Sequence, residues 1–291
     1  MKLAAFDIGG SAVKYGLWEN QQLSQTGKFA TPATFAEMQS EMKKITTLFG
    51  DNLQGVAISA PGAVNEKERR IDGISAVPYI HHRPIYDELT NFLQLPVTIE
   101  NDANCAGICE VEIGAAKDAE NVVFMVIGTG VGGAIFINRK IYKGSHLFGG
   151  EFGLMRNQNG RTLSLNGTVV KAAGYYSEKN GEEINGKELY RRFDAGEALA
   201  IEEVETMYQA LTESLYDIQV SIDPEVIVLG GGISAREDIA EELATRLQKM
   251  LDEATVGSIM PTITTCKFHN DANLIGAALN FENVFQDKSQ I

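Results

Sequence analysis

Apolar residues along the chain fall into short runs that end at glycine. One run covers residues 2–8 and stops at Gly9-Gly10-Ser11, after which the chain becomes apolar again. A second run, residues 122–127, stops in the same way at the glycine-rich residues 128–133. Short apolar runs bounded by glycine are typical of buried strands. The pattern therefore predicts two strand–turn–strand units and an internal duplication.

Helical spacing of apolar residues marks several of the segments between strands. Residues 34–37 read Thr-Phe-Ala-Glu, a capping box, and an apolar face continues from there to Gly50. A longer helical face precedes Pro224 and consists of Ile201, Val204, Met207, Leu211, Leu215 and Ile218. Further apolar runs that predict strands are residues 54–60, 97–99, 225–229 and 262–267. Strands that alternate with helices predict an α/β protein, and we expect residues 64–84 to be a loop.

The duplication predicts two lobes. We expect residues 1–118 to form the N-terminal lobe and residues 119–270 to form the C-terminal lobe. A last helix at about residues 271–285 is rich in small residues, including Gly276, which would let it pack closely and return to the first lobe. If the lobes face each other across a cleft, each contributes one glycine-rich turn to the same polyphosphate.

The charge balance excludes one class of partner. With 39 acidic and 25 basic residues, the chain carries a formal charge of −14. A broad nucleic-acid surface requires clustered Lys and Arg, and no basic run is long enough. No apolar run is long enough to cross a membrane, and the first strand begins directly after Met1. We therefore expect a cytoplasmic globular protein that binds neither nucleic acid nor a membrane.

The cysteines predict neither a disulfide scaffold nor a standard zinc site. Cys105, Cys109 and Cys266 contain no Cys-x-x-Cys pair, which is the usual spacing of structural zinc ligands. The His81-His82 pair lacks a third ligand at a useful spacing, so we expect these histidines to be surface or hydrogen-bonding residues. Buried free thiols are the expected state of the cysteines.

A cluster of amide and carboxylate side chains, Glu100-Asn101-Asp102-Ala103-Asn104, follows the strand at residues 97–99. Because Asn and Asp are favoured helix N-caps, one interpretation is an ordinary cap. The other interpretation is catalytic, since a carboxylate at a strand-to-helix junction can meet a substrate hydroxyl in fixed geometry. The glycine turns elsewhere, which suit phosphate, favour the second interpretation. Asp102 is therefore our candidate catalytic base.

Asp7 distinguishes the first strand unit from the second, because Ile127 occupies the equivalent position there. An acid before the Gly9-Gly10-Ser11 turn and a hydroxyl after it are what a metal–phosphate site requires. A Gly-Gly pair alone would be an ordinary tight turn. Asp7 is our candidate to hold hydrated magnesium close to the phosphates.

Three further turns are candidates for ligand contact. Residues 230–232 are three glycines, which let the backbone approach a flat group such as a purine with its ribose, although a plain strand-to-helix turn needs one or two. Residues 59–62, Ser-Ala-Pro-Gly, bring backbone amides to a small polar ligand or serve only as a turn. Glu151 lies among glycines, where a carboxylate can accept hydrogen bonds from a polyol or be a simple surface acid.

Five motifs in the same order together resemble the ROK family of sugar kinases and repressors, from residue 3 to about residue 280. They are Ala5-Phe6-Asp7-Ile8-Gly9-Gly10-Ser11, Glu100-Asn101-Asp102-Ala103-Asn104, Ile127-Gly128-Thr129-Gly130-Val131-Gly132-Gly133, Gly150-Glu151-Phe152-Gly153 and Leu229-Gly230-Gly231-Gly232-Ile233. The resemblance implies an actin-like, hexokinase-like (ribonuclease H-like) duplicated two-lobe α/β fold. It also implies a homodimer that uses ATP and Mg²⁺ to phosphorylate a sugar at its 6-hydroxyl.

The motif match assigns roles to individual residues. Asp102 would be the catalytic base. With the turn at residue 62 included, the predicted substrate-binding residues are Gly62, Asn101, Asp102 and Glu151. The predicted cofactor-binding residues are Asp7, Gly9, Gly10, Ser11, Lys14, Gly128, Thr129, Gly130, Gly231 and Gly232. Asp7 is also the predicted metal ligand.

The chain departs from the family pattern after Glu151. Many relatives carry a histidine soon after this turn and then a Cys-x-Cys-Gly-x-x-Gly-Cys zinc loop, whereas Leu154 follows Gly153 here and the loop has no cysteine. We therefore expect no structural zinc. The chain resembles the zinc-free branch that includes bacterial β-glucoside kinases, whose Glu-Phe-Gly and Leu-Asn elements match residues 151–153 and 165–166.

Without that histidine, the site is expected to leave room at carbon 1 of the sugar. A β-glucoside is then the predicted substrate, with Tyr79, Tyr175 or Tyr176 available to contact the substituent. N-acetylmannosamine kinase and glucokinase are the alternatives. A sugar-responsive repressor of the same family is an alternative of another class, but such regulators carry an additional N-terminal DNA-binding domain, and this chain opens on its phosphate strand. An inactive sugar-binding module would have lost the base or a phosphate turn.

Overall fold

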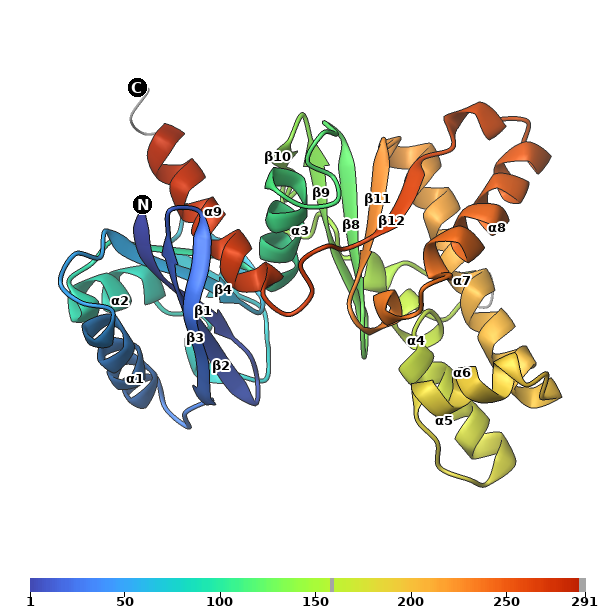
Figure 1. Ribbon diagram of the computed structural model, residues 1–291, viewed down its shortest axis with the longest axis horizontal. Coiled ribbons are helices and arrows are strands. Elements are labelled where there is room, and N and C mark those ends of the chain that lie inside the picture. The colour runs from blue at the N-terminus through green and yellow to red at the C-terminus, as the bar shows by residue number, and fades with distance from the viewer. Residues whose placement is uncertain (158–159, 288–291) are drawn as a thin grey trace. The chain divides into compact units, whose positions relative to one another are not determined.

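The computed structural model describes residues 1–157 and 160–287 and divides into two compact units (Figure 1). Unit 1 comprises Met1–Gly114, Gly144–Phe148 and the chain from Asn270 onward. Unit 2 comprises Ala115–Lys143 and Gly149–His269. Each unit contains one five-stranded sheet with its own helices.

The sheet of unit 1 has the strand order β3-β2-β1-β4-β7. Its strands are β1 (Lys2–Ile8), β2 (Ala12–Glu19), β3 (Gln22–Ala30), β4 (Gly55–Ala60) and β7 (Val97–Asn101). Neighbours are antiparallel from β3 to β1 and parallel from β1 to β7. The carboxyl ends of β1, β4 and β7 therefore lie at one edge of the sheet, and the chain turns there at Gly9, Pro61 and Asp102.

The sheet of unit 2 repeats this arrangement in the order β10-β9-β8-β11-β12. Its strands are β8 (Val122–Ile127), β9 (Val131–Ile137), β10 (Lys140–Ile141), β11 (Val226–Gly230) and β12 (Thr262–Thr265). The directions match too, since β8 is antiparallel to β9 and parallel to β11, which is parallel to β12. The predicted internal duplication is confirmed.

Helices cover both faces of the first sheet. On one face, α1 (Phe35–Leu48) and α2 (Ile85–Leu93) share an apolar core with alternate residues of β1 and β4. The predicted capping box is present, because the Thr34 hydroxyl accepts from the Glu37 amide and the Glu37 carboxylate accepts from the Thr34 amide. On the other face, α9 (Ala272–Asp287) crosses the sheet and packs on α3 (Asp102–Glu112).

Gly276 allows α9 and α3 to approach each other closely. A Cβ atom added at Gly276 would overlap the backbone carbonyl of Cys105. The small residues of the last helix thus serve the close packing that the sequence predicts, and α9 belongs to unit 1.

The helices of unit 2 bury a second core against β8 and β11. They are α4 (Leu163–Asn166), α5 (Val169–Asn180), α6 (Gly186–Asp194), α7 (Ala198–Ile222) and α8 (Ile239–Glu253). One residue of the predicted α7 face is wrong: Ile201 is 38% exposed, whereas Val204 and the later members are buried. In residues 1–157 and 160–287, no helix combines the length and the apolar character needed to cross a membrane.

The predicted loop at residues 64–84 is wrong in part. It begins in a short hairpin of β5 (Ala63–Asn65) and β6 (Arg70–Asp72), followed by a 3-10 turn at Pro78–Ile80. Each strand buries only one apolar side chain, Val64 or Ile71. A strand of three residues is too short to show the alternation of apolar and polar residues, so the sequence pattern did not predict β5 and β6. The other 3-10 turns are Phe152–Leu154, Gly232–Ala235 and Gly257–Ile259.

Candidate active site

Asn101 caps α3, and Asp102 is the first residue of the helix. The Asn101 side-chain oxygen accepts a hydrogen bond from the Asn104 amide at 3.2 Å, and its Nδ2 donates to the Gly62 carbonyl at 3.1 Å. Asp102 Oδ1 accepts from the Ala103 amide at 2.9 Å. The cap interpretation is therefore correct for Asn101 and leaves Asp102 to another role. Gly62, Asn101 and Asp102, all predicted to bind substrate, lie together.

The buried carboxylate of Glu100 holds the junction between β7 and α3 in place. Its side chain is 1% exposed, and Oε1 accepts from the Asn101 amide at 2.7 Å and from Asn104 Nδ2 at 2.9 Å. Hydrogen bonds to a buried carboxylate are strong, so they fix the start of α3. Sequence reasoning missed this role, although a charged residue at the end of a buried apolar strand was the available signal.

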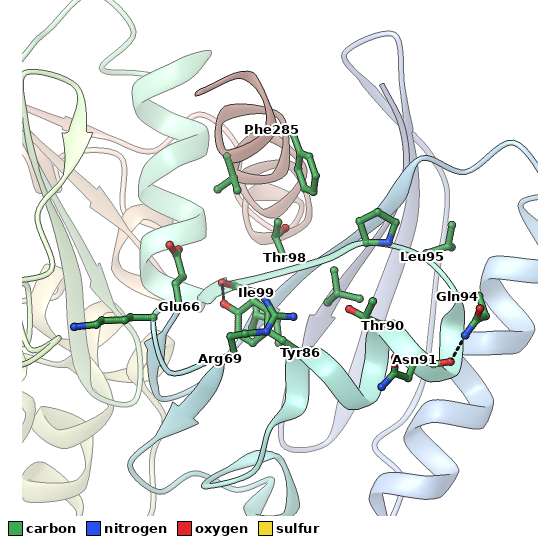
Figure 2. Close-up of a pocket in the computed structure, with 14 residues that line it drawn as sticks. Glu66, Arg69, Tyr86, Thr90, Asn91, Gln94, Leu95, Thr98, Ile99 and Phe285 are labelled. Carbon is green, nitrogen blue, oxygen red and sulfur yellow. Dashed lines mark hydrogen bonds between the residues drawn. The ribbon is translucent and has the colours of Figure 1, made fainter. Parts of the chain in front are cut away.

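A groove of about 830 Å³ runs beside β7 in unit 1 (Figure 2). It is lined by residues of β7, α2, the end of α9 and the segment 66–69, and includes none of the predicted site residues. In its wall, the Tyr86 hydroxyl donates to the Ile99 carbonyl at 2.9 Å, and Arg69 lies over the Tyr86 ring. These contacts anchor the strand that leads into Asn101 and Asp102.

Asp7 is the penultimate residue of β1, and one of its carboxylate oxygens is held by two donors. Ser59 Oγ donates to Asp7 Oδ1 at 2.8 Å, and Asn273 Nδ2 donates to the same oxygen at 3.0 Å. The second oxygen, Oδ2, lies 4.0 Å from the Lys14 ammonium, which also donates to the Asn270 carbonyl at 3.2 Å. A single carboxylate with one oriented oxygen suits Mg²⁺, which keeps several of its waters when it binds protein.

The turn after Asp7 is fixed by backbone contacts. The Gly9 amide donates to the Ala12 carbonyl at 3.1 Å, and the Thr31 hydroxyl donates to the Gly9 carbonyl at 2.5 Å. The Thr31 amide donates to the Ser11 carbonyl at 3.2 Å. A Cβ atom at Gly10 would come within 2.7 Å of Ala76 Cβ, so the close approach requires glycine.

Several carboxylates surround Cys105, which is completely buried in α3. Burial raises the pKa of the Cys105 thiol well above its usual range, and the negative charges of Glu100, Asp7 and Asp102 raise it further. A hydrogen bond with Ser59 acts in the opposite direction. The thiol is therefore neutral, and the fold of unit 1 brings Asp7 and Asp102 close enough to act on one atom.

Two glycine turns meet in unit 2. The Gly128 amide donates to the Gly130 carbonyl at 2.9 Å, which closes the turn between β8 and β9. Gly231 has a φ of 81°, and a Cβ there would lie 2.5 Å from the Ile127 carbonyl oxygen, so the two turns are adjacent. Among residues 1–157 and 160–287, no atom other than those of the glycine and its chain neighbours lies within 4 Å of a Cβ built at Gly128 or at Gly232. This open space beside bare backbone suits phosphate and a flat ring.

Glu151 has an exposed side chain and precedes the 3-10 turn of Phe152–Leu154. Gly150 has a φ of 92°, and a Cβ there would lie 2.6 Å from the Gly133 carbonyl oxygen, which sets the turn against β9. Nearby, Ser164 Oγ accepts from the Val131 amide at 3.0 Å. Over the described ranges, no three or more His, Cys, Asp and Glu side chains form a group that could hold a metal ion.

The three candidate tyrosines have different surroundings. Tyr176 is buried and hydrogen-bonded to Glu197 and Arg192, so the prediction that it is available to a ligand is wrong. Tyr79, in unit 1, donates to the Pro32 carbonyl at 2.7 Å. Tyr175 is half-buried, donates to the Leu165 carbonyl at 3.1 Å and lines a cavity of about 280 Å³ in unit 2.

The predicted residues thus form one group in each unit. Asp7, Gly9, Gly10, Ser11, Lys14, Gly62, Asn101 and Asp102 belong to unit 1, whereas Gly128, Thr129, Gly130, Glu151, Gly231 and Gly232 belong to unit 2. Sequence reasoning missed Ser59, Glu100 and Asn273, which hold the predicted residues in place.

The chain matches the model of the ROK family over residues 3–283. A β-glucoside kinase of Listeria monocytogenes is 32% identical over 292 residues, which cover 97% of each chain. An N-acetyl-D-glucosamine kinase of Mannheimia succiniciproducens is 29% identical and covers 96% of this chain and 99% of its own. A solved structure of a ROK family protein from Streptococcus pneumoniae in complex with sucrose is 35% identical, covers 100% of both chains and gives a TM-score of 0.90.

Two sheets of matching strand order, with glycine turns at equivalent strand ends, define a duplicated α/β protein of the actin-like, hexokinase-like class, which is also the fold of the solved ROK sugar kinases. The chain belongs to the ROK family. The relatives from Listeria and Mannheimia are named as sugar kinases, and the protein is an ATP-dependent sugar kinase. The predicted fold class, family and enzyme class are confirmed.

Proposed function

We propose that this kinase transfers the terminal phosphoryl group of ATP to the 6-hydroxyl of a β-glucoside. The placement of Asp102 as the first residue of α3, beside Asn101 and Gly62, supports the transfer most directly. The β-glucoside kinase of Listeria, similar over nearly its whole length, supports the choice of sugar. The sucrose complex of the Streptococcus relative supports a site that accepts a glycoside.

Each residue has a distinct part in the proposed reaction. Asp102 accepts the proton of the attacking hydroxyl, while Asn101 and Glu151 bind the other sugar hydroxyls. The glycine turns offer backbone amides to the phosphates, and Asp7 holds hydrated Mg²⁺. Bound magnesium supplies neutralisation of charge on the phosphate oxygens. The protein therefore contributes position and electrostatic stabilisation rather than covalent chemistry.

The environment of Tyr175 supports a substituent at carbon 1. Its hydroxyl bonds Leu165 in α4, and α4 packs against the 3-10 turn that follows Glu151. Leu154, in that turn, is 61% exposed and offers no hydrogen bond. An aromatic ring and an apolar side chain near a sugar ligand would gain contact with an aglycone but nothing with a free anomeric hydroxyl.

A sugar panel tests the proposed substrate. Specificity constants with ATP and Mg²⁺ are measured for cellobiose, other β-glucosides, glucose, fructose and N-acetylmannosamine. We expect β-glucosides to give values about tenfold above either free monosaccharide, because apolar contact replaces the missing polar one. Values that favour glucose or N-acetylmannosamine by about tenfold would contradict the proposal and indicate a hexose or amino-sugar kinase.

In the same panel of sugars, Tyr175→Ala measures what the aromatic ring contributes to the specificity constant for a β-glucoside. We expect the specificity constant for cellobiose to fall about fivefold while that for glucose changes less than about twofold. Tyr175→Phe keeps the ring and loses only the bond to Leu165, so it should retain most of the activity toward cellobiose. Equal losses for both sugars in Tyr175→Ala would show that the ring does not contact the aglycone.

The amino-sugar kinase of Mannheimia, which also matches over most of the chain, makes an N-acetylated hexosamine the second candidate acceptor. Three further features belong to the proposal. We expect the protein to act as a homodimer, to reside in the cytoplasm, and to have its two lobes at residues 1–118 and 119–270.

A further inference from the structure

Two segments distant in sequence supply donors to the carboxylate of Asp7, which precedes the last residue of β1. Ser59 comes from the end of β4, and Asn273 comes from the first turn of α9. Ser59 is itself hydrogen-bonded to Cys105 in α3. All four residues belong to unit 1, so the arrangement does not depend on the position of unit 2.

Both donors bind the same oxygen of Asp7. The distances to Oδ1 are 2.8 Å from Ser59 Oγ and 3.0 Å from Asn273 Nδ2, both within the normal range for hydrogen bonds. Two directional bonds to one oxygen fix the rotation of the carboxyl group. They leave Oδ2 directed toward Lys14, whose amine lies 4.0 Å away and is 43% exposed.

We propose that Ser59 and Asn273 are positioning residues that hold Asp7 Oδ1 so that Oδ2 is aligned with the hydrated magnesium of the nucleotide. The inference rests on the proposed function, because it assigns the metal to Asp7. A metal ligand is effective only when its own orientation is fixed by the groups around it, and here two neutral donors supply that orientation. Neither adds a charge that would weaken the carboxylate as a ligand.

The proposal separates metal binding from sugar binding. Ser59 and Asn273 donate to Asp7, whereas the Asn101 side chain bonds Gly62 and Asn104, so we expect the predicted sugar-binding residues to be unaffected by the loss of either donor. Loss of either donor lets the carboxyl group rotate while the other donor remains. The expected signature is weaker metal binding with an unchanged KM for sugar.

The test measures Mn²⁺ binding directly, by electron paramagnetic resonance of the free ion, in protein saturated with a non-hydrolysable ATP analogue. We expect the dissociation constant of Mn²⁺ to rise about tenfold in Asn273→Ala and in Ser59→Ala, the lower end of the loss for a hydrogen bond to a charged group. In the double variant, the dissociation constant of Mn²⁺ should rise by less than the product of the two single-variant factors, because both donors bind the same oxygen.

Asn283→Ala is the matched control. Asn283 is also on α9 and also donates its amide to a carboxylate, but it is exposed and its acceptor is Glu112 Oε1, at 3.3 Å, in place of Asp7. Mn²⁺ affinity in this variant should stay within about twofold of wild type. Melting temperatures identify any variant that fails to fold, and if Asn273→Ala fails, Ser59→Ala carries the test.

Wild-type Mn²⁺ affinity in folded Asn273→Ala and Ser59→Ala would overturn the positioning roles, as would an equal loss in Asn283→Ala. The result is distinguishable from failure of the proposed function, which is read from sugar phosphorylation by wild type in parallel. A wild type that binds Mn²⁺ with the analogue but phosphorylates no sugar contradicts the function and still permits the comparison. A wild type that binds no Mn²⁺ contradicts both.

Discussion

Asp102→Asn is expected to lower kcat by about 10²- to 10⁴-fold, the usual contribution of a positioned general base. The substitution keeps the shape of the side chain and should leave the start of α3 intact, because Asn101 provides the cap and Glu100 holds Asn101 and Asn104. Sugar and nucleotide affinities should therefore stay within about tenfold of wild type. Steady-state kinetics and equilibrium binding measure the two quantities separately.

The control for Asp102→Asn is the same change at Asp51, which lies in an exposed turn of unit 1. Its kcat should match wild type within about twofold. If Asp102→Asn keeps more than about a tenth of wild-type turnover, Asp102 is not the base. A loss of sugar affinity as large as the loss of kcat would instead make Asp102 a binding residue.

Gly276→Ala is expected to destabilise the protein by about 2 to 3 kcal/mol, because the added methyl group overlaps the Cys105 carbonyl and two packed helices have to move apart. Gly174→Ala, the same change inside α5, should have the opposite sign. In the part of the chain that the structure describes, no atom outside the local helix backbone and the chain neighbours lies within 4 Å of its Cβ position, so the variant gains helix propensity worth about 1 kcal/mol without a clash.

Urea unfolding monitored by circular dichroism measures both glycine variants. If the two variants change stability by the same amount and sign, then the contact between α9 and α3 does not control the effect. Activity is informative too, because α3 carries Asp102 at its first residue. Displacement of α3 by Gly276→Ala should lower kcat even in molecules that remain folded.

Strands β1, β4, β8 and β11 were predictable because each is a largely apolar run that ends close to a glycine. The repeated order in the two halves predicted the duplication, and the Thr34–Glu37 capping box predicted the start of α1. The hairpin of β5 and β6 was missed because three-residue strands show no period. Ile201 was wrongly placed in the core because the apolar stripe alone does not show at which residue along the helix burial begins.

The sequence identifies only those candidate site residues that belong to short continuous motifs. Asp7 is the penultimate residue of β1 and Asp102 directly follows β7, and the fold brings together strand ends that lie at one edge of a parallel sheet. Ser59 and Asn273 could not be assigned, because their partner, Asp7, is 52 and 266 residues away and no spacing records that contact. Their roles depend on the strand order and on α9 packing against β1 and β4.

Tyr175 and Tyr176 show that the sequence alone does not decide which of two adjacent helical residues is buried. The two residues are adjacent in α5, and successive helical positions point in directions about 100° apart. Only the packing of the helix decides that Tyr176 is buried beside Glu197 whereas Tyr175 lines a cavity. The sequence offered Tyr79, Tyr175 and Tyr176 as equal candidates and could not show that Tyr176 is buried.

The product formed from ATP, Mg²⁺ and cellobiose tests the proposed reaction most directly. Proton–phosphorus correlation NMR of that product is expected to show coupling between the phosphorus and the carbon-6 protons of the non-reducing glucose unit. No phosphorylated product from cellobiose or any other sugar of the panel, or a phosphate on a different hydroxyl, would contradict the assignment of this protein as a kinase of the 6-hydroxyl of β-glucosides.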